Sequence, residues 1–304
     1  MKILITGGAG FIGYHLSQEL SRQGHEIVSI DNFFHPCGAL HPLVLYGDIR
    51  DHRFMDILVS QVDLVYHLAA QIHVDYSIEH PIETADINVM GTLELLNACV
   101  KYKKKIILAS SSEVYGTSQT DMISETHPLD GQSPYAATKI AADRLAKAYH
   151  DTFGLQVVIV RNFNIFGEYQ NDDSYGSVIA KFTRAALRGE TLKIYGDGEQ
   201  QRDYMHIFDA VRMYNFCQDI KLFGQPINMG TGKTVKIVDL ARKIVEYTNS
   251  SSLIEHVQPR LGEVQRLCCD ATLAKSLGLV SQTDFDKQLF EYIDWYETTC
   301  DRPR

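Results

Sequence analysis

The sequence predicts an α/β protein with a doubly wound parallel sheet and a smaller mixed α/β lobe. Between residues 3 and 161, apolar runs of strand length alternate with segments of helical periodicity. This order requires parallel strands joined by right-handed crossovers. From about Gly167 to Gly176 the sequence becomes polar and turn-rich, and the later elements no longer alternate regularly. We therefore expect one main sheet, followed by a second lobe that covers its ends.

The first apolar run, Ile3–Thr6, leads into a loop with Gly7, Gly10 and Gly13 at three-residue spacing. Gly7 permits the tight turn, Gly10 lets a phosphate approach the backbone, and Gly13 lets the following helix pack on the strand. The helix N-terminus then offers N–H groups and a partial positive charge to a pyrophosphate. A structural turn is the alternative, but the strand and helix on either side favour a Rossmann dinucleotide site.

The second predicted strand, His25–Ile30, follows a helix over Tyr14–Arg22 and ends at Asp31 and Asn32. In this fold an acidic residue at the strand tip holds the adenosine ribose hydroxyls of NAD. Its charge would repel the extra phosphate of NADP. Asp31 could instead only form a turn, since aspartate is common there. We favour the first interpretation, so NAD is the expected cofactor.

The remaining elements are predicted in chain order. In the first half they are strands over Val44–Ile49, Val62–Ala70, Lys105–Ser110 and Gln156–Arg161, and helices over Asn88–Val100 and Pro134–Phe153. Asp48 could contact the adenine or cap the next helix. In the second half they are a short strand between Gly189 and Gly198 and helices over Ile179–Leu187, Val238–Thr248, Thr272–Leu277 and Phe285–Glu297. The expected NAD-binding domain is residues 1–166 with a returning segment near 203–233, and the substrate lobe is residues 167–202 and 234–304.

Composition limits the partners. The 304 residues carry a formal net charge of −9, so no general basic surface for nucleic acid or anionic membranes is expected. No run approaches the ~20 apolar residues of a membrane helix. The six cysteines show no paired CxxC spacing, which makes a metal site or disulfide framework unexpected. The first strand begins at the start of the sequence, so we expect no signal peptide and a cytoplasmic protein.

Three residues form the candidate reaction centre. Tyr135 and Lys139 lie four residues apart on a predicted helix, and hence on one face. A nearby ammonium group and a positive nicotinamide ring would favour tyrosinate, so Tyr135 could act as a base. Ser111 follows the fifth strand, where ligand-binding residues gather, and its hydroxyl could share a substrate proton with Tyr135. Tyrosine and lysine at this spacing are usually surface residues, but the whole order of motifs argues against coincidence.

With these motifs, the sequence resembles the extended short-chain dehydrogenase/reductase family, in its NAD-dependent nucleotide-sugar epimerase/dehydratase branch. The resemblance covers nearly the whole chain. Its markers are Thr6–Gly13, Asp31–Asn32, Gly47–Ile49, His67–Ala70, Asn88–Thr92, Ser110–Gly116, Ser133–Lys139, Arg161–Asn164, Ile194–Gly198, Arg202–Tyr204 and Pro259–Glu263. It implies a cofactor site made of Gly7, Gly10, Phe11, Ile12, Gly13, Asp31, Asn32, Asp48, Ile49, Leu68, Ala69, Ala70, Asn88, Tyr135 and Lys139.

The resemblance also implies that a tightly held NAD⁺ transiently oxidises the C4 hydroxyl of a nucleoside-diphosphate sugar. Tyr135 would take the hydroxyl proton, Lys139 would lower the pKa of Tyr135 and hold the nicotinamide ribose, and Ser111 would bind the reacting oxygen. The resulting 4-keto sugar could be reduced on its other face, lose water across C5 and C6, or lose a C6 carboxylate as CO₂. A non-catalytic NAD-binding protein is a further alternative, against which the intact reaction centre argues.

Glu113 bears on the choice among these reactions. Dehydratases and decarboxylases of the family resemble this chain in having a glutamate here, and in a dehydratase it removes the C5 proton. Ser112 stands where many dehydratases have an aspartate, although the GDP-mannose type is similar to this chain. His73 lies where dehydratases have a substrate-facing histidine. Glu113 could instead cap loop N–H groups, and His73 could be a packed or exposed loop residue.

One further segment resembles the epimerases, and one further position departs from the pattern of the family. Tyr175–Ile179 looks more like the epimerases, and Glu168 follows Gly167 where proline is usual. On balance the sequence favours a sugar-nucleotide dehydratase, with a 4-epimerase as the alternative and a nucleotide-uronic acid decarboxylase third. The expected catalytic residues are Ser111, Ser112, Glu113, Tyr135 and Lys139.

The resemblance also implies a substrate site. Asn164, Arg202 and Arg260 align with positions that hold the diphosphate and its ribose, and Tyr195 lies in the stretch that contacts the base. Arginine suits phosphate because its fork binds two oxygens, although either arginine could form a surface ion pair instead. The expected substrate residues are His73, Ser111, Asn164, Val178, Tyr195, Arg202 and Arg260. The nucleotide could be UDP, GDP, CDP or dTDP, and the family usually dimerises through the helices at Asn88–Val100 and Pro134–Phe153.

Overall fold

The computed structural model describes residues 1–37, 43–173, 177–260, 263–282 and 284–300. Its largest element is a seven-stranded sheet in the order β10-β6-β5-β4-β1-β2-β3, with every neighbouring pair parallel. The strands are β1 (Lys2–Thr6), β2 (Glu26–Asp31), β3 (Val44–Tyr46), β4 (Leu64–His67), β5 (Lys105–Ser111), β6 (Val157–Asn162) and β10 (Pro226–Met229). The predicted doubly wound sheet is confirmed. Its order reverses between β1 and β4, and ligands of such sheets bind at that point.

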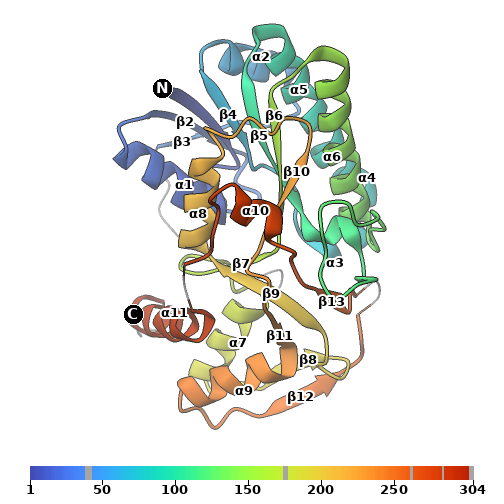
Figure 1. Ribbon diagram of the computed structural model, residues 1–304. Helices are drawn as coiled ribbons and strands as arrows, with labels where there is room; N and C mark the ends of the chain where they lie inside the picture. The colour runs from blue at the N-terminus through green and yellow to red at the C-terminus, as the bar shows by residue number, and fades with distance from the viewer. Residues whose placement is uncertain (38–42, 174–176, 261–262, 283, 301–304) are drawn as a thin grey trace.

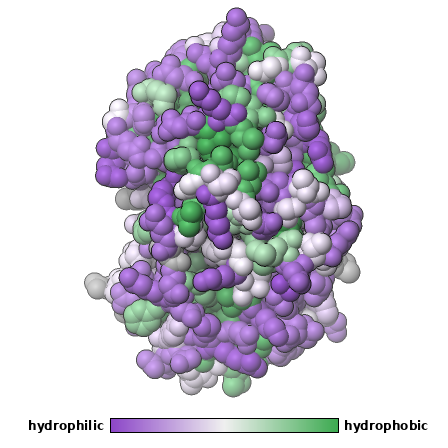
Figure 2. Space-filling model, viewed as in Figure 1, coloured by the Kyte–Doolittle hydropathy of each residue, from purple (hydrophilic) through white to green (hydrophobic). Residues whose placement is uncertain are grey.

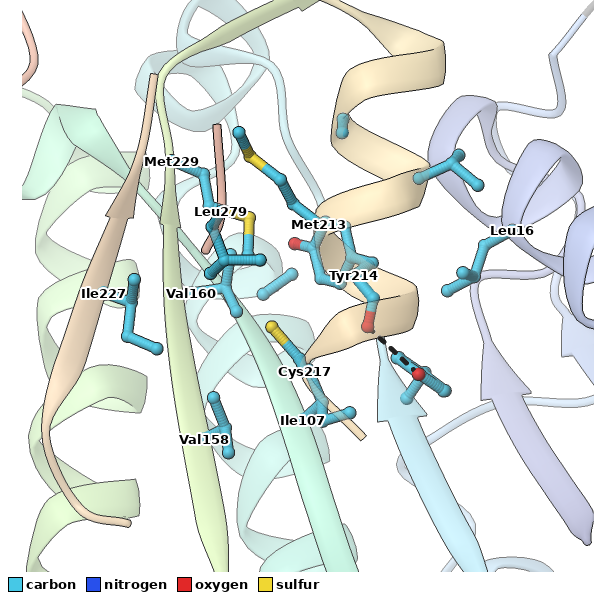
Figure 3. Packing of buried hydrophobic residues seen from close by; sticks show 14 of the residues in the cluster. Leu16, Ile107, Val158, Val160, Met213, Tyr214, Cys217, Ile227, Met229 and Leu279 are labelled. Atoms are coloured by element: carbon cyan, nitrogen blue, oxygen red, sulfur yellow. Dashed lines mark hydrogen bonds between the residues drawn. The ribbon is translucent and has the colours of Figure 1, made fainter. Parts of the chain in front are cut away.

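Helices cover both faces of this sheet (Figure 1). One face carries α1 (Phe11–Arg22), α8 (Ile207–Phe216) and α10 (Thr272–Ser276), and the other carries α2 (His52–Ser60), α5 (Gly91–Tyr102) and α6 (Pro134–Phe153). Alternate strand residues point to the two faces, so each face has its own apolar core. Figure 3 shows Met213 of α8 and Cys217, the residue just after this helix, packing toward Val158 and Val160 of β6.

The smaller lobe lies beyond the carboxyl ends of the large sheet (Figure 1). In a four-stranded sheet, β9 (Gln201–His206) pairs with β7 (Asn164–Phe166), β11 (Thr234–Lys236) and β13 (Arg266–Leu267), while β8 (Leu192–Tyr195) pairs with β12 (Ile254–Val257). Apolar residues of α7 (Val178–Leu187), α9 (Ile237–Tyr247) and α11 (Phe285–Thr299) form its core. This arrangement confirms the predicted smaller mixed lobe.

Two short helices and two irregular turns complete the large domain. They are α3 (Val74–Glu79), α4 (Pro81–Ala85), a π-helical turn over Asp86–Met90 and a 3₁₀ turn over Ser112–Tyr115. The 3₁₀ turn follows β5 directly, so it carries the segment of Glu113 into the space between the lobes. Figure 2 shows hydrophobic side chains in the upper half of this face, which holds the large sheet, between hydrophilic margins.

Several element boundaries differ from those expected from the sequence. Helix α1 begins at Phe11 rather than Tyr14, with Gly10 as its N-cap, and α5 begins at Gly91 because Asn88 lies in the π-helical turn. Asp48 does not cap α2. That helix is capped by Asp51, whose carboxylate accepts a hydrogen bond from the Phe54 amide at 3.0 Å.

The division into two domains stays a proposal. The segment near 203–233 contributes β10 and α8 to the large sheet and its cover, as we expected, whereas β9 at its start lies in the smaller lobe. Farther along the chain, Ala274 of α10 and Leu279 also pack under the large sheet. The chain therefore crosses between the lobes several times. No helix in the described residues is both long and apolar enough to span a membrane.

Candidate active site

A cleft follows the carboxyl ends of the large sheet and continues between the sheet and the smaller lobe. Its central part has a volume of about 470 Å³ and receives residues from the glycine loop, β5, α6 and the segment after β6. Gly7, Leu68 and His73 connect it to the hollow beside β2, while Asn164 and Val178 connect it to the hollow under α7. One continuous cleft thus joins the expected cofactor residues, the expected reaction centre and the expected substrate residues.

The glycine loop is too tight for side chains. Gly7 has a φ of +74°, and a Cβ on it would lie 2.7 Å from the Ala69 amide nitrogen. A Cβ on Gly13 would lie 2.1 Å from the Gly7 carbonyl oxygen, so α1 packs directly on the loop. Among the residues that the structure describes, no side-chain hydrogen bond caps the N-terminus of α1. These features leave a backbone cradle at a helix N-terminus, which fits a pyrophosphate.

Asp31 holds the same loop from the tip of β2. One carboxylate oxygen accepts a hydrogen bond from the Ala9 amide at 3.1 Å, and the other accepts one from the Phe33 amide at 2.7 Å. The carboxylate is only partly buried and lines the cleft beside Asn32. Its position therefore fits the adenosine ribose of a dinucleotide, and with the glycine cradle it completes a site of the right chemistry for NAD.

Most of the other expected cofactor residues also line the cleft. They are Phe11, Ile12, Asp48, Ile49, Leu68, Ala69, Ala70, Tyr135 and Lys139. Gly10 is not among the lining residues, although it caps α1 beside them. Arg50, which we did not expect, binds both oxygens of the Asp48 carboxylate, at 3.0 and 2.6 Å, and holds its pKa below the usual range. The signal available in the sequence was an arginine two residues after Asp48.

Asn88 lies behind the cleft rather than on it. Its side-chain amide nitrogen donates to the Gln71 carbonyl and to the Thr138 hydroxyl, both at 2.9 Å, and its oxygen accepts from the Gln71 amide at 2.8 Å. The side chain is buried and lies between the loop after β4 and helix α6. Asn88 thus connects the loop after β4 to α6, and its expected contact with a cofactor stays a prediction.

Ser111, Tyr135 and Lys139 meet in the centre of the cleft. Burial raises the pKa of Tyr135 to about 12, and a hydrogen bond with Ser111 opposes this rise. The Lys139 ammonium donates to the Ala109 carbonyl at 2.8 Å, and burial lowers its pKa to about 8. Burial thus outweighs any lowering of the Tyr135 pKa by Lys139 in this structure.

Glu113 lines the same cleft, whereas Ser112 is buried behind it and is not among the lining residues. The Ser111 hydroxyl accepts a hydrogen bond from the Glu113 amide at 3.2 Å and so starts the 3₁₀ turn. Burial and the nearby Glu263 raise the pKa of Glu113, while Arg202 opposes the rise. No hydrogen bond among the described residues reaches the Glu113 carboxylate, so the capping role considered above is not seen. The expected catalytic role of Ser112 stays a prediction.

The expected nucleotide-binding residues gather at the other end of the cleft. Asn164, Val178, Tyr195, Arg202 and Arg260 line the hollow between α7, β8 and β9. The Arg260 guanidinium lies 4.0 Å over the Tyr195 ring, and one of its nitrogens lies 3.5 Å from an Asp75 carboxylate oxygen. Both arginines line this hollow, and the contact of Arg260 with Asp75 is the ion pair that the sequence left as its alternative role. Of the segment that resembles the epimerases, Tyr175 and Gly176 lie outside the described residues.

His73 and two unexpected residues lie at the junctions of the cleft. His73 lines it after β4, with its ring centroid 4.3 Å from that of His35. Lys181 lies one helical turn after Val178, and burial and Arg260 lower its pKa. Tyr204 of β9 lines the central part of the cleft and the hollow under α7. Helical spacing from Val178 could have identified Lys181, but no local pattern indicates Tyr204.

Residues 3–230 match the family model described as the NAD dependent epimerase/dehydratase family. The chain belongs to this family. It is 40% identical to the UDP-N-acetyl-alpha-D-glucosaminuronate decarboxylase of Bacillus cytotoxicus over 268 residues, which cover 84% of this chain and 83% of that protein. Family membership therefore confirms the resemblance found in the sequence, and NAD as the cofactor of the family.

Two solved structures of the epimerase/dehydratase type are similar to this fold over almost its whole length. The UDP-glucose 4-epimerase of Thermotoga maritima with UDP-glucose superposes with a TM-score of 0.94 at 31% identity, covering 99% of this chain and 100% of that one. The dTDP-glucose 4,6-dehydratase DesIV of Streptomyces venezuelae, with NAD bound, gives 0.91 at 30% identity and covers 98% of both chains. Proteins named for three different reactions are thus similar to this chain. Among the described residues, no cluster of histidine, cysteine or acidic side chains could hold a metal ion.

Proposed function

We propose that this chain is a cytoplasmic NAD⁺-dependent enzyme that oxidises a nucleoside-diphosphate sugar transiently at C4 and then dehydrates it across C5 and C6. The observation that supports this most directly is that Ser111, Glu113, Tyr135 and Lys139 line one cleft. When bound, NAD⁺ accepts a hydride from the sugar and later returns it. The residues at the carboxyl ends of β1, β2 and β4 would hold the dinucleotide through the glycine cradle and Asp31.

Tyr135 is the base for the C4 hydroxyl in this proposal. It is buried, so its proton can be exchanged with the substrate without competition from bulk water. Ser111 orients the reacting oxygen, because it already hydrogen-bonds Tyr135. A positive charge on Lys139, four residues along the same face of α6, favours the deprotonated tyrosine electrostatically. These three side chains account for the proton transfer at C4.

Glu113 carries the second step. A carbonyl at C4 acidifies the C5 proton, and a carboxylate in the same cleft can remove it. Since the pKa of Glu113 is raised, the same carboxyl group can hold that proton and pass it to the departing C6 hydroxyl. This sequence of transfers does not require an acidic residue at position 112. Arg202 and Arg260 would hold the diphosphate, and Asn164, Val178 and Tyr195 would complete the nucleotide site.

Decarboxylation of a nucleotide-uronic acid is the second candidate, favoured by one specific observation. Ser112 is buried away from the cleft, so Glu113 would be the one residue of this turn available to protonate a leaving hydroxyl. Loss of CO₂ requires no such proton. The 40% identity to a decarboxylase of this family supports the same alternative.

One experiment separates the reactions. The purified protein is incubated with NAD⁺ and a panel of UDP, dTDP, GDP and CDP sugars and uronic acids, and the products are examined by mass spectrometry and NMR. We expect a 4-keto product lighter than its substrate by one water. Loss of CO₂ from a uronic acid would establish the second candidate instead. A product of unchanged mass with inverted C4 would make the protein a 4-epimerase, and no turnover of any sugar would refute the proposed chemistry.

We also propose a homodimer formed through the face that carries α4, α5 and α6. Ile82 of α4, Met90 just before α5 and Phe153 at the end of α6 are exposed apolar side chains near this face. Burial of such residues stabilises association. Light scattering of the purified chain should give the mass of two copies, and Ile82→Lys should shift it toward one copy. A monomeric wild-type protein would refute the dimer.

A further inference from the structure

A buried ion pair lies directly under the reaction centre. Arg161 of β6 and Asp143 of α6 are each only 1% exposed. The guanidinium donates to both carboxylate oxygens, at 2.8 and 2.9 Å. Burying two charges is costly, and replacing such a pair with apolar residues is often neutral or stabilising. Stability alone therefore gives no reason for this pair to occupy the core, and its neighbours suggest another role.

On one side the pair contacts the segments that carry Lys139 and Ser111. Asp143 lies four residues after Lys139, on the same face of α6. Its carboxylate also accepts a hydrogen bond at 3.1 Å from the hydroxyl of Ser110, the residue before Ser111. In the sheet, Ser110 is the register partner of Arg161. The pair thus fixes α6 against the end of β5.

On its other side the guanidinium holds the turn that carries Glu113. It donates to the Tyr115 hydroxyl at 2.8 Å and lies 4.9 Å over the Tyr115 ring. Tyr115 ends the 3₁₀ turn in which Glu113 lies, and its hydroxyl donates to Asn228 of β10 at 2.6 Å. A single guanidinium therefore connects the three segments that present Ser111, Glu113 and Lys139 to the cleft.

We propose that Asp143 and Arg161 are positioning residues for the C4 chemistry, which hold Lys139, Ser111 and Glu113 in their mutual arrangement without touching the substrate. This inference rests on the proposed function, since it assigns the pair to that reaction. It also has an electrostatic side. Burial lowers the pKa of Lys139 and the charge of Asp143 opposes this, so Asp143 favours the ammonium form. His67 of β4 also faces Lys139 but is neutral near pH 7, because burial lowers its pKa to about 3.

The test removes both charges together, so that neither is left unpaired in the core. In Asp143→Leu/Arg161→Met the side chains are apolar and of similar size. The control is Lys147→Met/Asp151→Leu, which removes an exposed ion pair of 2.6 Å from the same helix. All chains are first compared by thermal unfolding. If the buried double variant does not fold, Asp143→Asn, which keeps the shape of the side chain, is measured in its place.

Two readouts are compared between these chains. In the first, Lys139 is titrated by NMR in protein isotope-labelled at the lysine ε carbons, with Lys139→Met identifying its signal. We expect a midpoint near the pKa of about 8 in the wild type and one lower by about one pH unit in the buried variant. In the second, kcat on the sugar identified by the panel should fall roughly 100-fold with little change in KM, since small displacements at a reacting centre have this effect.

The outcomes are distinguishable. A folded buried variant with the wild-type Lys139 titration and kcat would overturn the inference and leave the pair a structural element only. Equal effects in the control would also overturn it, because any charge removal on α6 would then suffice. If the wild type turned over no nucleotide sugar, the proposed function would fail, whereas the Lys139 titration would still decide whether the pair acts on the reaction centre.

Discussion

Replacing Gly13 with alanine should separate cofactor binding from general stability. A Cβ at this position would lie 2.1 Å from the Gly7 carbonyl oxygen and 2.9 Å from its carbon. Real Cβ atoms essentially never approach closer than 3.0 Å, so α1 and the glycine loop must separate by about 1 Å. The loop is backbone rather than a flexible side chain, so it cannot give way locally. The cradle for the pyrophosphate is thereby displaced.

The size of the effect follows from this displacement. Overpacking of this kind costs about 1–3 kcal/mol, and about 1.4 kcal/mol corresponds to a tenfold change in affinity. We therefore expect NAD⁺ to bind Gly13→Ala roughly 10- to 100-fold more weakly. Isothermal titration calorimetry measures this directly, and thermal unfolding with and without NAD⁺ provides a second measure, because a ligand stabilises the folded state according to its affinity.

Gly24→Ala is the matched control. Gly24 has a φ of +84°, so alanine strains the backbone there by about 1–2 kcal/mol, but a Cβ would have no neighbour within 4 Å. This glycine ends α1 at the far end from the loop. The control should lose stability and keep its affinity for NAD⁺. Wild-type affinity in Gly13→Ala would refute the assignment of the loop, and equal losses in both variants would show that the effect is global.

Three further changes test the reaction centre and the core. Tyr135→Phe should lower kcat roughly 10²- to 10⁴-fold in steady-state assays with little change in substrate Kd, whereas Tyr149→Phe on the same helix should not. Glu113→Gln should block the step at C5 but not the oxidation at C4, so absorbance should reveal reduced nicotinamide accumulating on the protein; product formation at the wild-type rate would contradict this role. Burial lowers the pKa of His67 to about 3, below its ordinary ~6.5. At a pH between these two values, the unfolded chain therefore binds a proton at His67 that the folded chain does not bind. The free energy of unfolding, measured with urea, should therefore fall by up to about 1.4 kcal/mol per pH unit as the pH drops through this window, and His67→Gln should flatten the dependence; equal slopes in both chains would argue against it.

The sequence predicts α6 with the bounds seen in the structure because its signals are local. Ser133 caps it, with its hydroxyl accepting from the Ala136 amide at 3.1 Å, Pro134 occupies the first turn, and Gly154 ends it with a φ of +69°. The glycine loop and the tip of β2 are equally local. In contrast, β9 pairs with strands from three distant parts of the chain, and no periodicity in a short window records such partners.

The same distinction between local and distant signals explains which residues of the candidate site could be predicted from the sequence. Tyr135, Lys139 and Ser111 were predicted because one helical face and one strand end determine where they lie. Ser112 was placed in the catalytic set by alignment with relatives, but the 3₁₀ turn directs it into the core. Asn88 lies in a π-helical turn, whose extra residue per turn changes the face that the side chain occupies. Irregular backbone is therefore where the direction of a side chain is hardest to predict from the sequence.

The position of β10 at the end of the large sheet has a consequence for the nascent chain. Until Pro226–Met229 has been synthesised, β6 is an edge strand of the sheet. One edge of its backbone then has unpaired N–H and C=O groups, and its side chains Val158 and Val160 are apolar. Strands β7, β8 and β9 and helix α7 of the smaller lobe lie between β6 and β10 in the chain, so they are synthesised before β10. The large domain therefore cannot be completed before part of its neighbour exists. A chain cut after residue 166 should aggregate rather than fold.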